Sequence, residues 1–423
     1  MKKASLCFLV VLGVLLVMDG CFAHKDEEAQ KTKLRVAIFD GAYGVAYWEE
    51  IAKAFEEQYP QVHVELDINA NIGNILLPRM NVKDVPDVVY LSSSDSSGYT
   101  QQMIEKQMLT PLDDVIDAHM QEQFLDNILS SKLLRPYQDQ RLYLAPLYYN
   151  VTGLWYNAKL FATYGYEVPK TWDEFFALGD RAKADGFDLF LYQGLNPTYL
   201  EAMLWPMLAE KLGEDGLDAI FRLESDAWSQ PGVLEVLRIF ERIHDGGYMS
   251  EDTIILTYME AQKRFVQGDA LFIPCGNWLL QEMAQEIADT TDYLRFMNVP
   301  TFSPTAQAYA SVMVEQIYVP KDANQVDLGK AFVAFQFEKE NAKKNIEMSG
   351  GYVPLKDVVG KENKAQPFAI FTQGVTPITA SFDKRGNVNF YDEVFEELSK
   401  VLAGDIRSED MIMYLNQRSA DIK

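Results

Sequence analysis

The stretch that decides the fold is LRVAIFDGAYGVAYWEEIAKAFEEQYPQVHVEL, which runs from Leu34 to Leu66. Its apolar run at 34–39 predicts a strand, and a helical segment follows the loop at 40–44. One face of that helix carries Trp48, Ile51, Ala52, Phe55 and Tyr59. Pro60 ends the helix, and VHVEL predicts the next strand. A strand, a helix and a strand in this order predict parallel strands joined by a right-handed crossover.

The same alternation continues along the chain, which predicts an α/β protein. VPDVVYL (85–91) predicts a third strand that runs into SSSDSSG (92–98), and a second set of elements begins near Leu142. TWDE (171–174) predicts a capping box at the start of a helix. In open α/β sheets the binding crevice lies at the carboxyl ends of the strands. We expect the loops at 40–47, 92–99, 193–198 and 275–278 to line it.

The N-terminus has the pattern of a secretory leader. Two lysines precede an apolar run from Leu6 to Met18, which is shorter than the roughly 20 residues that a membrane-spanning helix needs. Gly20-Cys21 resembles a bacterial lipoprotein cleavage site, although Asp19 stands where a small neutral residue is usual. We therefore expect a signal peptide at 1–20, a lipidated Cys21, a tether at 21–33 and an extracytoplasmic, membrane-anchored protein. An ordinary signal peptide is the alternative.

Composition excludes some partners. The chain has 38 basic and 62 acidic residues, a formal net charge of −24. Such a surface repels nucleic acid, which requires a clustered basic footprint. Of three cysteines, Cys7 lies in the leader, Cys21 at the expected anchor and Cys275 alone. No internal disulfide is expected, so a large hydrophobic core must hold the fold together.

Motifs for catalysis and for metal binding are missing from the sequence. The four histidines are isolated, and none has the spacing of a metal ligand or of a nucleophile and its base. Cys275 lies in an apolar run and is interpreted as a small core residue. We therefore expect no catalytic residue, metal or cofactor. Carboxylates are too numerous for a glycosidase pair to be excluded by counting.

An unusually placed tryptophan indicates the ligand. In FIPCGNWLLQEM (272–283) the apolar residues after Trp278 form one helical stripe, and Trp278 projects to the opposite, polar side. A rigid indole provides a flat surface for the apolar face of a pyranose ring, and amide and carboxylate side chains bind its hydroxyl groups. The residues that we expect to bind the ligand are Trp278, Asn277, Tyr43, Asp95, Trp205, Glu201, Gln193, Tyr149, Glu315 and Tyr352.

Three segments resemble a known family. They are GLWYNAKLFATYGYEVPKTWDEFFALGDRAKADG (153–186), FVQGDALFIPCGNW (265–278) and GGYVPL (350–355). In this order they are similar to the maltose-binding-like, family 1 extracellular solute-binding proteins of carbohydrate ABC importers. YQG (192–194), SDAWSQPGV (225–233) and FIPCGNWLLQEM resemble more narrowly the N-acetylglucosamine- and diacetylchitobiose-binding members.

The resemblance implies a periplasmic-binding-protein-like fold, with two α/β lobes joined by a hinge and a ligand cleft between them. It implies an N-lobe at 34–145 plus 271–320 and a C-lobe at 146–270 plus 321–423. A monomer would capture a saccharide by hinge closure, without making or breaking a bond, and deliver it to the transmembrane subunits of an ABC permease. Another oligosaccharide as the ligand, or a secreted glycoside hydrolase, remains as an alternative.

Overall fold

The computed structural model describes residues 31–422 except 42, 94, 96, 126–127, 131–132, 288–292, 357, 359–366, 368–369, 371–372 and 380–389. The expected signal peptide and Cys21 lie outside the described residues. The first strand begins at Thr32, so the last residues of the expected tether at 21–33 belong to the sheet. Among the described helices, none has both the length and the apolar character needed to cross a membrane.

Nine strands of the described chain form one mixed sheet with the order β2-β1-β3-β8-β4-β6-β5, while β7 pairs with β4 and β9 with β8. The strands are β1 (Thr32–Phe39), β2 (Val62–Asn69), β3 (Val88–Ser92), β4 (Ala145–Asn157), β5 (Asp188–Phe190), β6 (Ala270–Gly276), β7 (Leu294–Met297), β8 (Tyr309–Tyr318) and β9 (Thr376–Ile378). β1 pairs in parallel with β2 and with β3, which confirms the predicted parallel strands. β8 runs antiparallel to both β3 and β4.

Helices pack on both sides of this sheet. The α-helices of the described chain are α1 (Ala46–Gln58), α2 (Ile72–Met80), α3 (Tyr99–Glu105), α4 (Ala118–Gln121), α5 (Ala158–Tyr164), α6 (Trp172–Ala184), α7 (Glu201–Phe221), α8 (Val233–Asp245), α9 (Tyr258–Gln267), α10 (Leu279–Glu282), α11 (Val326–Phe335), α12 (Lys339–Ser349), α14 (Phe390–Ala403) and α15 (Ser408–Ile422). Short 3-10 helices are η1 (Ile128–Ser130), η2 (Pro197–Leu200), η3 (Ala227–Ser229) and η4 (Glu251–Ile255).

Local sequence explains where individual helices begin and which face they bury. α1 buries Trp48, Ile51 and Phe55, as its periodicity predicts. At α6 the Thr171 side chain accepts a hydrogen bond from the backbone N–H of Glu174, at 3.3 Å. The expected capping box is only half formed, because the Glu174 carboxylate accepts from the N–H of Lys170 instead of from that of Thr171.

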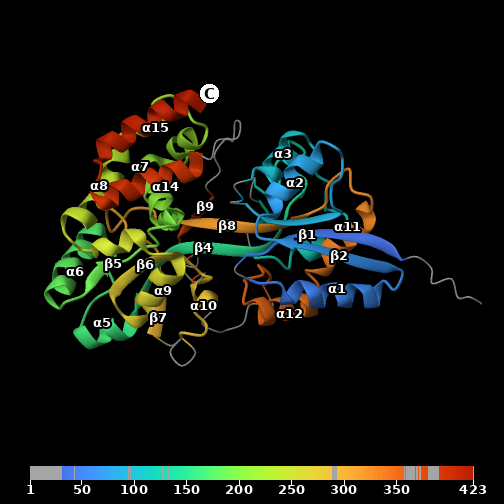
Figure 1. The fold of residues 1–423 in the computed structure, drawn as a ribbon, viewed down its shortest axis with the longest axis horizontal. Coiled ribbons are helices and arrows are strands. Elements are labelled where there is room, and N and C mark those ends of the chain that lie inside the picture. The colour runs from blue at the N-terminus through green and yellow to red at the C-terminus, as the bar shows by residue number, and fades with distance from the viewer. Residues whose placement is uncertain are drawn as a thin grey trace, which may run out of the picture.

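The protein consists of two α/β lobes connected by two long strands. Figure 1 shows β1 and β2 with α1, α2, α11 and α12 in one lobe, and β5, β6 and β7 with α5 to α9, α14 and α15 in the other. β3 pairs with β1 and therefore belongs to the first lobe. β4 and β8 extend from one lobe into the other. We call the first the N-lobe and the second the C-lobe. β4 pairs with β8 through its first half and with β6 and β7 through its second half, so the same strand belongs to both lobes.

The hydrophobic cores assign two segments differently from the expected lobe boundaries. Residues Leu271 and Phe272 of β6 pack in a C-lobe core with Phe175 of α6, whereas the segment 271–320 was expected in the N-lobe. Phe332 of α11 packs in the N-lobe core with Val36 of β1, whereas 321–423 was expected in the C-lobe. The reason is that β8 is a shared strand: the chain enters the N-lobe within this strand and then continues there through α11 and α12.

Gly153 of β4 packs so closely against β7 that a side chain at this position is expected to destabilise the protein. Gly153 lies opposite Cys275 of β6, and a Cβ atom at Gly153 would lie 2.6 Å from the Phe296 ring and 2.7 Å from the Met297 carbonyl oxygen. Because backbone cannot yield as a flexible side chain does, Gly153→Ala is expected to lower the free energy of unfolding by about 1–3 kcal/mol. Urea denaturation measures this change. Lys53→Ala on the exposed face of α1 is the control, and equal unfolding midpoints for the two variants would contradict the prediction.

Candidate ligand-binding site

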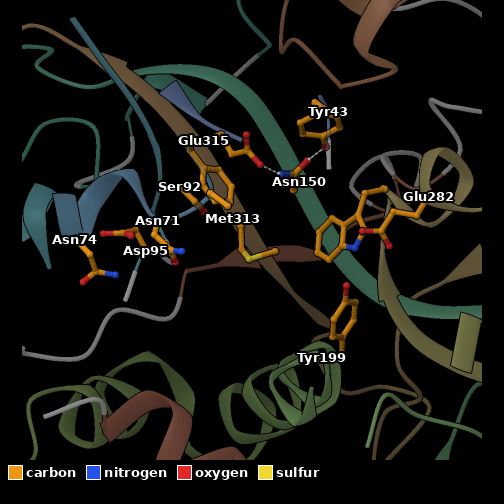
Figure 2. Close-up of a pocket in the computed structure, with 13 residues that line it drawn as sticks. Tyr43, Asn71, Asn74, Ser92, Asp95, Asn150, Tyr199, Glu282, Met313 and Glu315 are labelled. Atoms are coloured by element: carbon orange, nitrogen blue, oxygen red, sulfur yellow. Dashed lines mark hydrogen bonds between the residues drawn. The ribbon is translucent and has the colours of Figure 1, made fainter. Parts of the chain in front are cut away.

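A cavity of about 350 Å³ lies where the two lobes and the shared strands meet. Its lining residues are Phe39, Tyr43, Ala70, Asn71, Asn74, Ser92, Asp95, Asn150, Tyr199, Trp278, Glu282, Met313 and Glu315. Figure 2 shows Asn71, Asn74 and Asp95 on one side and Tyr199 and Glu282 on the other, with Met313 and Glu315 between them. Both lobes thus contribute a wall, and the shared strands β4 and β8 form the floor.

The N-lobe wall is polar and is built at the carboxyl ends of β2 and β3. Asn71 and Asn74 lie at the start of α2, directly after β2, and Asp95 lies in the loop after β3. The Asp95 carboxylate accepts a hydrogen bond from the Ser97 hydroxyl. The loop that carries Asp95 and Ser97 packs closely against Gly73 of α2. A side chain at Gly73 would not fit, because a Cβ atom there would lie 2.3 Å from Ser97 Oγ and 2.9 Å from the Asp95 carboxylate. This wall offers amide donors and a carboxylate acceptor to the cavity.

The C-lobe wall is aromatic. Trp278 is half-buried and occupies the N-cap position of α10, directly after β6. Its ring lies 6.1 Å from that of Tyr199, with 64° between the two planes. The indole lies against Gly276, where a Cβ atom would be 1.9 Å from the ring. Because Gly276 lacks a side chain, the indole has room to pack against the backbone at this position while it borders the cavity.

The floor is a hydrogen-bond network centred on Asn150 of β4. The Asn150 Oδ1 atom accepts from the Tyr43 hydroxyl and from Asn277 Nδ2, the latter at 3.4 Å. Its Nδ2 donates to Oε1 of Glu315, on the neighbouring strand β8, at 3.5 Å. Figure 2 shows Tyr43, Asn150 and Glu315 linked in this order. Donors from two loops therefore bind the amide oxygen of Asn150, and the amide nitrogen of Asn150 in turn binds the Glu315 carboxyl group.

Burial perturbs two carboxyl groups of the cavity. Desolvation raises the pKa of Glu315 to about 8 and that of Glu282 to about 7, and in Glu282 a hydrogen bond from Gln262 partly offsets the rise. Desolvation, followed by the nearby charge of Glu315, also raises the pKa of the Tyr43 hydroxyl. Near neutral pH these acids are thus partly or mostly protonated, in contrast to carboxylates at the surface.

Four of the residues predicted from the sequence line the cavity together: Trp278, Tyr43, Asp95 and Glu315. Asn277 does not line it, because its polar groups bind β4. Its N–H donates to the Val151 carbonyl at 3.1 Å, and its Oδ1 accepts from the Val151 N–H at 3.0 Å. Asn277 therefore holds the turn before Trp278 against the floor.

The structure does not place Trp205, Glu201 or Gln193 among the cavity-lining residues. Trp205 is 0% exposed and packs at 5.5 Å from Phe395, which belongs to α14. The Glu201 carboxylate accepts a hydrogen bond from the hydroxyl of Tyr391, also on α14. Both residues lie outside the apolar stripe of α7, but they are buried because α14 covers that side of the helix. Gln193 is fully buried, and its Nε2 donates to the Pro274 carbonyl at 2.9 Å.

Tyr149 and Tyr352 also lie apart from the cavity lining. The N–H of Tyr149 donates to the carbonyl of Tyr352 at 3.0 Å, and both rings contact a C-lobe core. Burial raises the pKa of the Tyr352 hydroxyl to about 12. Their contacts connect β4 with the segment after α12, so they support the junction between the lobes.

Sequence reasoning missed several lining residues, and only some of them could have been found. Glu282 follows Trp278 by one helical turn, a spacing that places both on one side. Tyr199 comes one residue after the loop expected at 193–198. Asn150 and Met313 lie inside long apolar strands, where nothing in the pattern distinguishes them from core residues.

Cys275 is a core residue, as expected. Its side chain is buried, burial raises the pKa of its thiol, and Gln262 Nε2 lies 3.7 Å from its sulfur. A thiol with a raised pKa is a poor nucleophile. Within the described ranges, no group of three or more His, Cys, Asp or Glu side chains has the geometry to hold a metal ion.

Two lobes that enclose a cavity with walls from both define a binding protein of the periplasmic type. Residues 41–343 match the sequence profile of the bacterial extracellular solute-binding proteins, and the chain belongs to this family. The fold is shared with the apo form of RafE from Streptococcus pneumoniae, with a TM-score of 0.77 at 19% identity over 93% of this chain and 98% of that one.

Curated relatives are similar over most of the chain. The diacetylchitobiose binding protein NgcE of Streptomyces coelicolor is 27% identical over 311 residues, which are 71% of this chain and 65% of that protein. A multiple sugar-binding protein of Streptococcus mutans is 26% identical over 303 residues, 67% of each chain. The match therefore spans about two thirds of the length of these relatives.

The raised pKa of Glu315 predicts a measurable effect of pH on stability. A carboxyl whose pKa is higher in the folded than in the unfolded chain binds its proton more tightly when folded, so its contribution to stability is present at low pH. That contribution is lost as the pH rises from about 4.5 toward 8. Glu315→Gln cannot ionise and should lose less stability over this interval, by at least about 1 kcal/mol, since one pKa unit corresponds to about 1.4 kcal/mol.

Urea denaturation at pH 5 and at pH 8.5 measures this difference. The exposed Glu49→Gln on α1 serves as the control and should follow the wild type. Glu201 and Glu282, each with a pKa raised to about 7, keep part of the slope in every protein. Parallel stability curves for wild type and Glu315→Gln would contradict the assignment.

Proposed function

We propose that this chain is the substrate-binding component of an ABC importer and that it captures a saccharide containing N-acetylglucosamine, such as a chitooligosaccharide. It acts outside the cytoplasm, binds the saccharide between its lobes and delivers it to the permease subunits. The observation that carries the proposal is the position of Trp278: a half-buried indole on the wall of a cavity between two lobes. The names of NgcE and of the multiple sugar-binding protein support a saccharide as the ligand.

The chemistry of the cavity suits a pyranose ring. Trp278 and Tyr199 provide apolar ring surface that can pack against the C–H face of a sugar. Asn71, Asn74 and Asp95 on the facing wall provide the donors and acceptors that hydroxyl groups need. One face of the ligand would thus contact the C-lobe and its polar rim the N-lobe.

Capture follows from this division of contacts. An open and a closed arrangement of the lobes interconvert, and a ligand that contacts both walls favours the closed one by its differential affinity. β4 and β8 form the connection about which the lobes move, because they are shared between them. The closed form is the one recognised by the permease.

Two alternatives remain testable. A different oligosaccharide could occupy the same cavity. A secreted glycoside hydrolase is favoured by one observation only: Glu282 and Glu315 have raised pKa values, as the general acid of a glycosidase does. Product formation from chitooligosaccharides incubated with the protein would establish hydrolysis and overturn the transport proposal.

The proposed function is tested by a thermal-shift screen of the mature protein against mono- and oligosaccharides. A ligand that binds only the folded state raises the melting temperature by mass action. We expect chitooligosaccharides to raise it, with calorimetry then giving the affinity. No shift with any saccharide of a broad panel would overturn the proposal.

Replacing the indole measures its contribution to binding. Trp278→Ala is expected to weaken saccharide binding by roughly 2 kcal/mol or more, about thirtyfold, as for a buried aromatic anchor. Isothermal titration calorimetry measures the affinity. Tyr414→Ala, which removes an exposed aromatic ring from α15, is the control and should leave the affinity unchanged. An unchanged affinity in Trp278→Ala would remove this residue from the site.

We further propose that a lipid on Cys21 anchors the mature chain to the membrane. This residue follows a leader of secretory type and precedes a polar tether. In cells, Cys21→Ser is expected to move the protein from the membrane fraction to the soluble extracytoplasmic fraction, as followed by immunoblotting. Retention of the variant in the membrane fraction would contradict lipidation at this position.

A further inference from the structure

The aromatic wall of the cavity also carries a carboxyl group. Among the described lining residues, the C-lobe contributes Tyr199, Trp278 and Glu282, and Figure 2 shows Glu282 on the same side as Tyr199. The N–H of Glu282 donates to the Trp278 carbonyl at 3.0 Å, so the two residues are one helical turn apart. Side chains at this spacing are neighbours on a helix surface. Glu282 therefore places a polar group beside the indole.

One oxygen of this carboxyl group is held by the protein and the other is available. Gln262 of α9 is 0% exposed, and its Nε2 donates to Glu282 Oε2 at 2.6 Å. Glu282 itself is partly exposed, and its Oε1 accepts no hydrogen bond from the described residues. In contrast to Glu315 Oε2, it is not one of the buried atoms of the described chain that lack a partner. Glu282 Oε1 is thus accessible to solvent, while the bond from Gln262 fixes the orientation of the carboxyl group.

A sugar that packs on an indole needs a directional contact as well. The attraction between its C–H face and the ring depends on the apolar area in contact, so it leaves the sugar free to turn on the ring surface. A hydrogen bond at the edge of the sugar removes this freedom, because its geometry is narrow. Glu282 lies where such a bond can form without the facing lobe.

We propose that Oε1 of Glu282 accepts a hydrogen bond from a hydroxyl group of the sugar unit that packs on Trp278, and so fixes the orientation of that unit in the cavity. Gln262 is a positioning residue, since it holds the carboxyl group and does not line the cavity. The inference rests on the proposed function of the chain as a saccharide receptor.

The titratable groups that surround Glu282 are neutral near pH 7. They are Tyr199 of η2, Cys275 of β6 and Tyr43 of the loop after β1. Burial, followed by nearby charges that include Glu282, raises the pKa of each of these three groups. Glu315, on the floor, is the other cavity acid with a raised pKa, and it is mostly protonated at pH 7. Ionisation of Glu282 therefore has its own signature in ligand binding.

The sign of this signature follows from the direction of the proposed hydrogen bond. Burial raises the pKa of Glu282 to about 7, so both of its forms are present at neutral pH. A sugar hydroxyl that donates to Oε1 stabilises the carboxylate and lowers its pKa in the complex. Binding then releases a proton and becomes tighter as the pH rises through about 7. A protonated Glu282 that donated to the ligand would give the opposite dependence.

Titration calorimetry of the wild type at pH 6 and at pH 8 provides the first test. The probe is diacetylchitobiose, and a saccharide that the thermal-shift screen selects in its place is titrated in the same way. We expect binding at least about threefold tighter at pH 8, with proton release at pH 7 in buffers of different ionisation enthalpy. Equal affinity at the two pH values, tighter binding at pH 6 or proton uptake overturns the inference.

A matched pair of variants assigns the effect to Glu282. In Glu282→Gln the new amide oxygen can accept from Gln262, which leaves an NH2 group toward the ligand in place of an acceptor. This variant should bind at least about tenfold more weakly at pH 8 and change less than twofold between pH 6 and pH 8. Glu210→Gln removes a partly buried carboxyl group that binds the Phe302 N–H outside the cavity, and should behave as the wild type. Wild-type affinity in Glu282→Gln overturns the inference.

The role of Gln262 has a readout of its own. The hydrogen bond from Gln262 lowers the pKa of Glu282, against the larger effect of burial. Gln262→Leu removes this bond and should move the midpoint of the pH dependence upward by at least about half a unit, with affinity recovering at higher pH. Loss of affinity at every pH without a shifted midpoint would show a structural role only and overturn the positioning role.

The outcomes separate this inference from the function on which it rests. A saccharide that binds tightly, with the same affinity in Glu282→Gln as in the wild type, overturns the role of Glu282 and leaves the saccharide receptor intact. Failure of every saccharide of the panel to bind the wild type overturns both. If Glu282→Gln does not fold, the pH dependence and proton release of the wild type decide.

Discussion

The pairing of β4 with β8 is the constraint on which the rest of the structure depends. These antiparallel strands run through both lobes, and their register places Asn150 opposite Met313 and Tyr149 opposite Val314. A shift by one residue would turn Asn150 and Glu315 away from the cavity, because side chains alternate between the faces of a strand. The floor of the cavity and the connection between the lobes are therefore one element, so a change in the strands acts on both.

The cavity owes its chemistry to three different kinds of local structure. The N-lobe wall uses loops and a helix start at the carboxyl ends of parallel strands, where polar groups converge in open α/β sheets. The C-lobe wall uses a turn that carries an indole over a glycine, Trp278 over Gly276. The floor uses buried polar side chains in the middle of strands, where each must find a partner. The floor also contains Glu315 Oε2, a buried oxygen without a hydrogen-bond partner among the described residues.

The fold class and the aromatic wall could be predicted from the sequence because both depend on local periodicity. The helix after the first strand buries the predicted face, and Trp278 borders the cavity as its position off the apolar stripe indicates. Trp205 shows the limit of that argument: it too is off its stripe, but α14, almost 200 residues later in the chain, covers it. The role of Asn150 could not be predicted from local sequence because it depends on the pairing of β4 with β8. The lobe boundaries could not be predicted for a related reason: a strand that is shared by two lobes carries no sequence signal that marks where one lobe ends.

The tryptophans of this protein differ sharply in their surroundings. Five of them, Trp48, Trp155, Trp172, Trp205 and Trp228, are buried in the cores. The sixth, Trp278, is half-buried beside the cavity and lies against Gly276. Among these six indoles, Trp278 alone lines the cavity, so a molecule that enters displaces water from no other tryptophan ring. The protein thus contains a built-in optical reporter, in which a change of intrinsic fluorescence on occupancy originates from one identifiable chromophore.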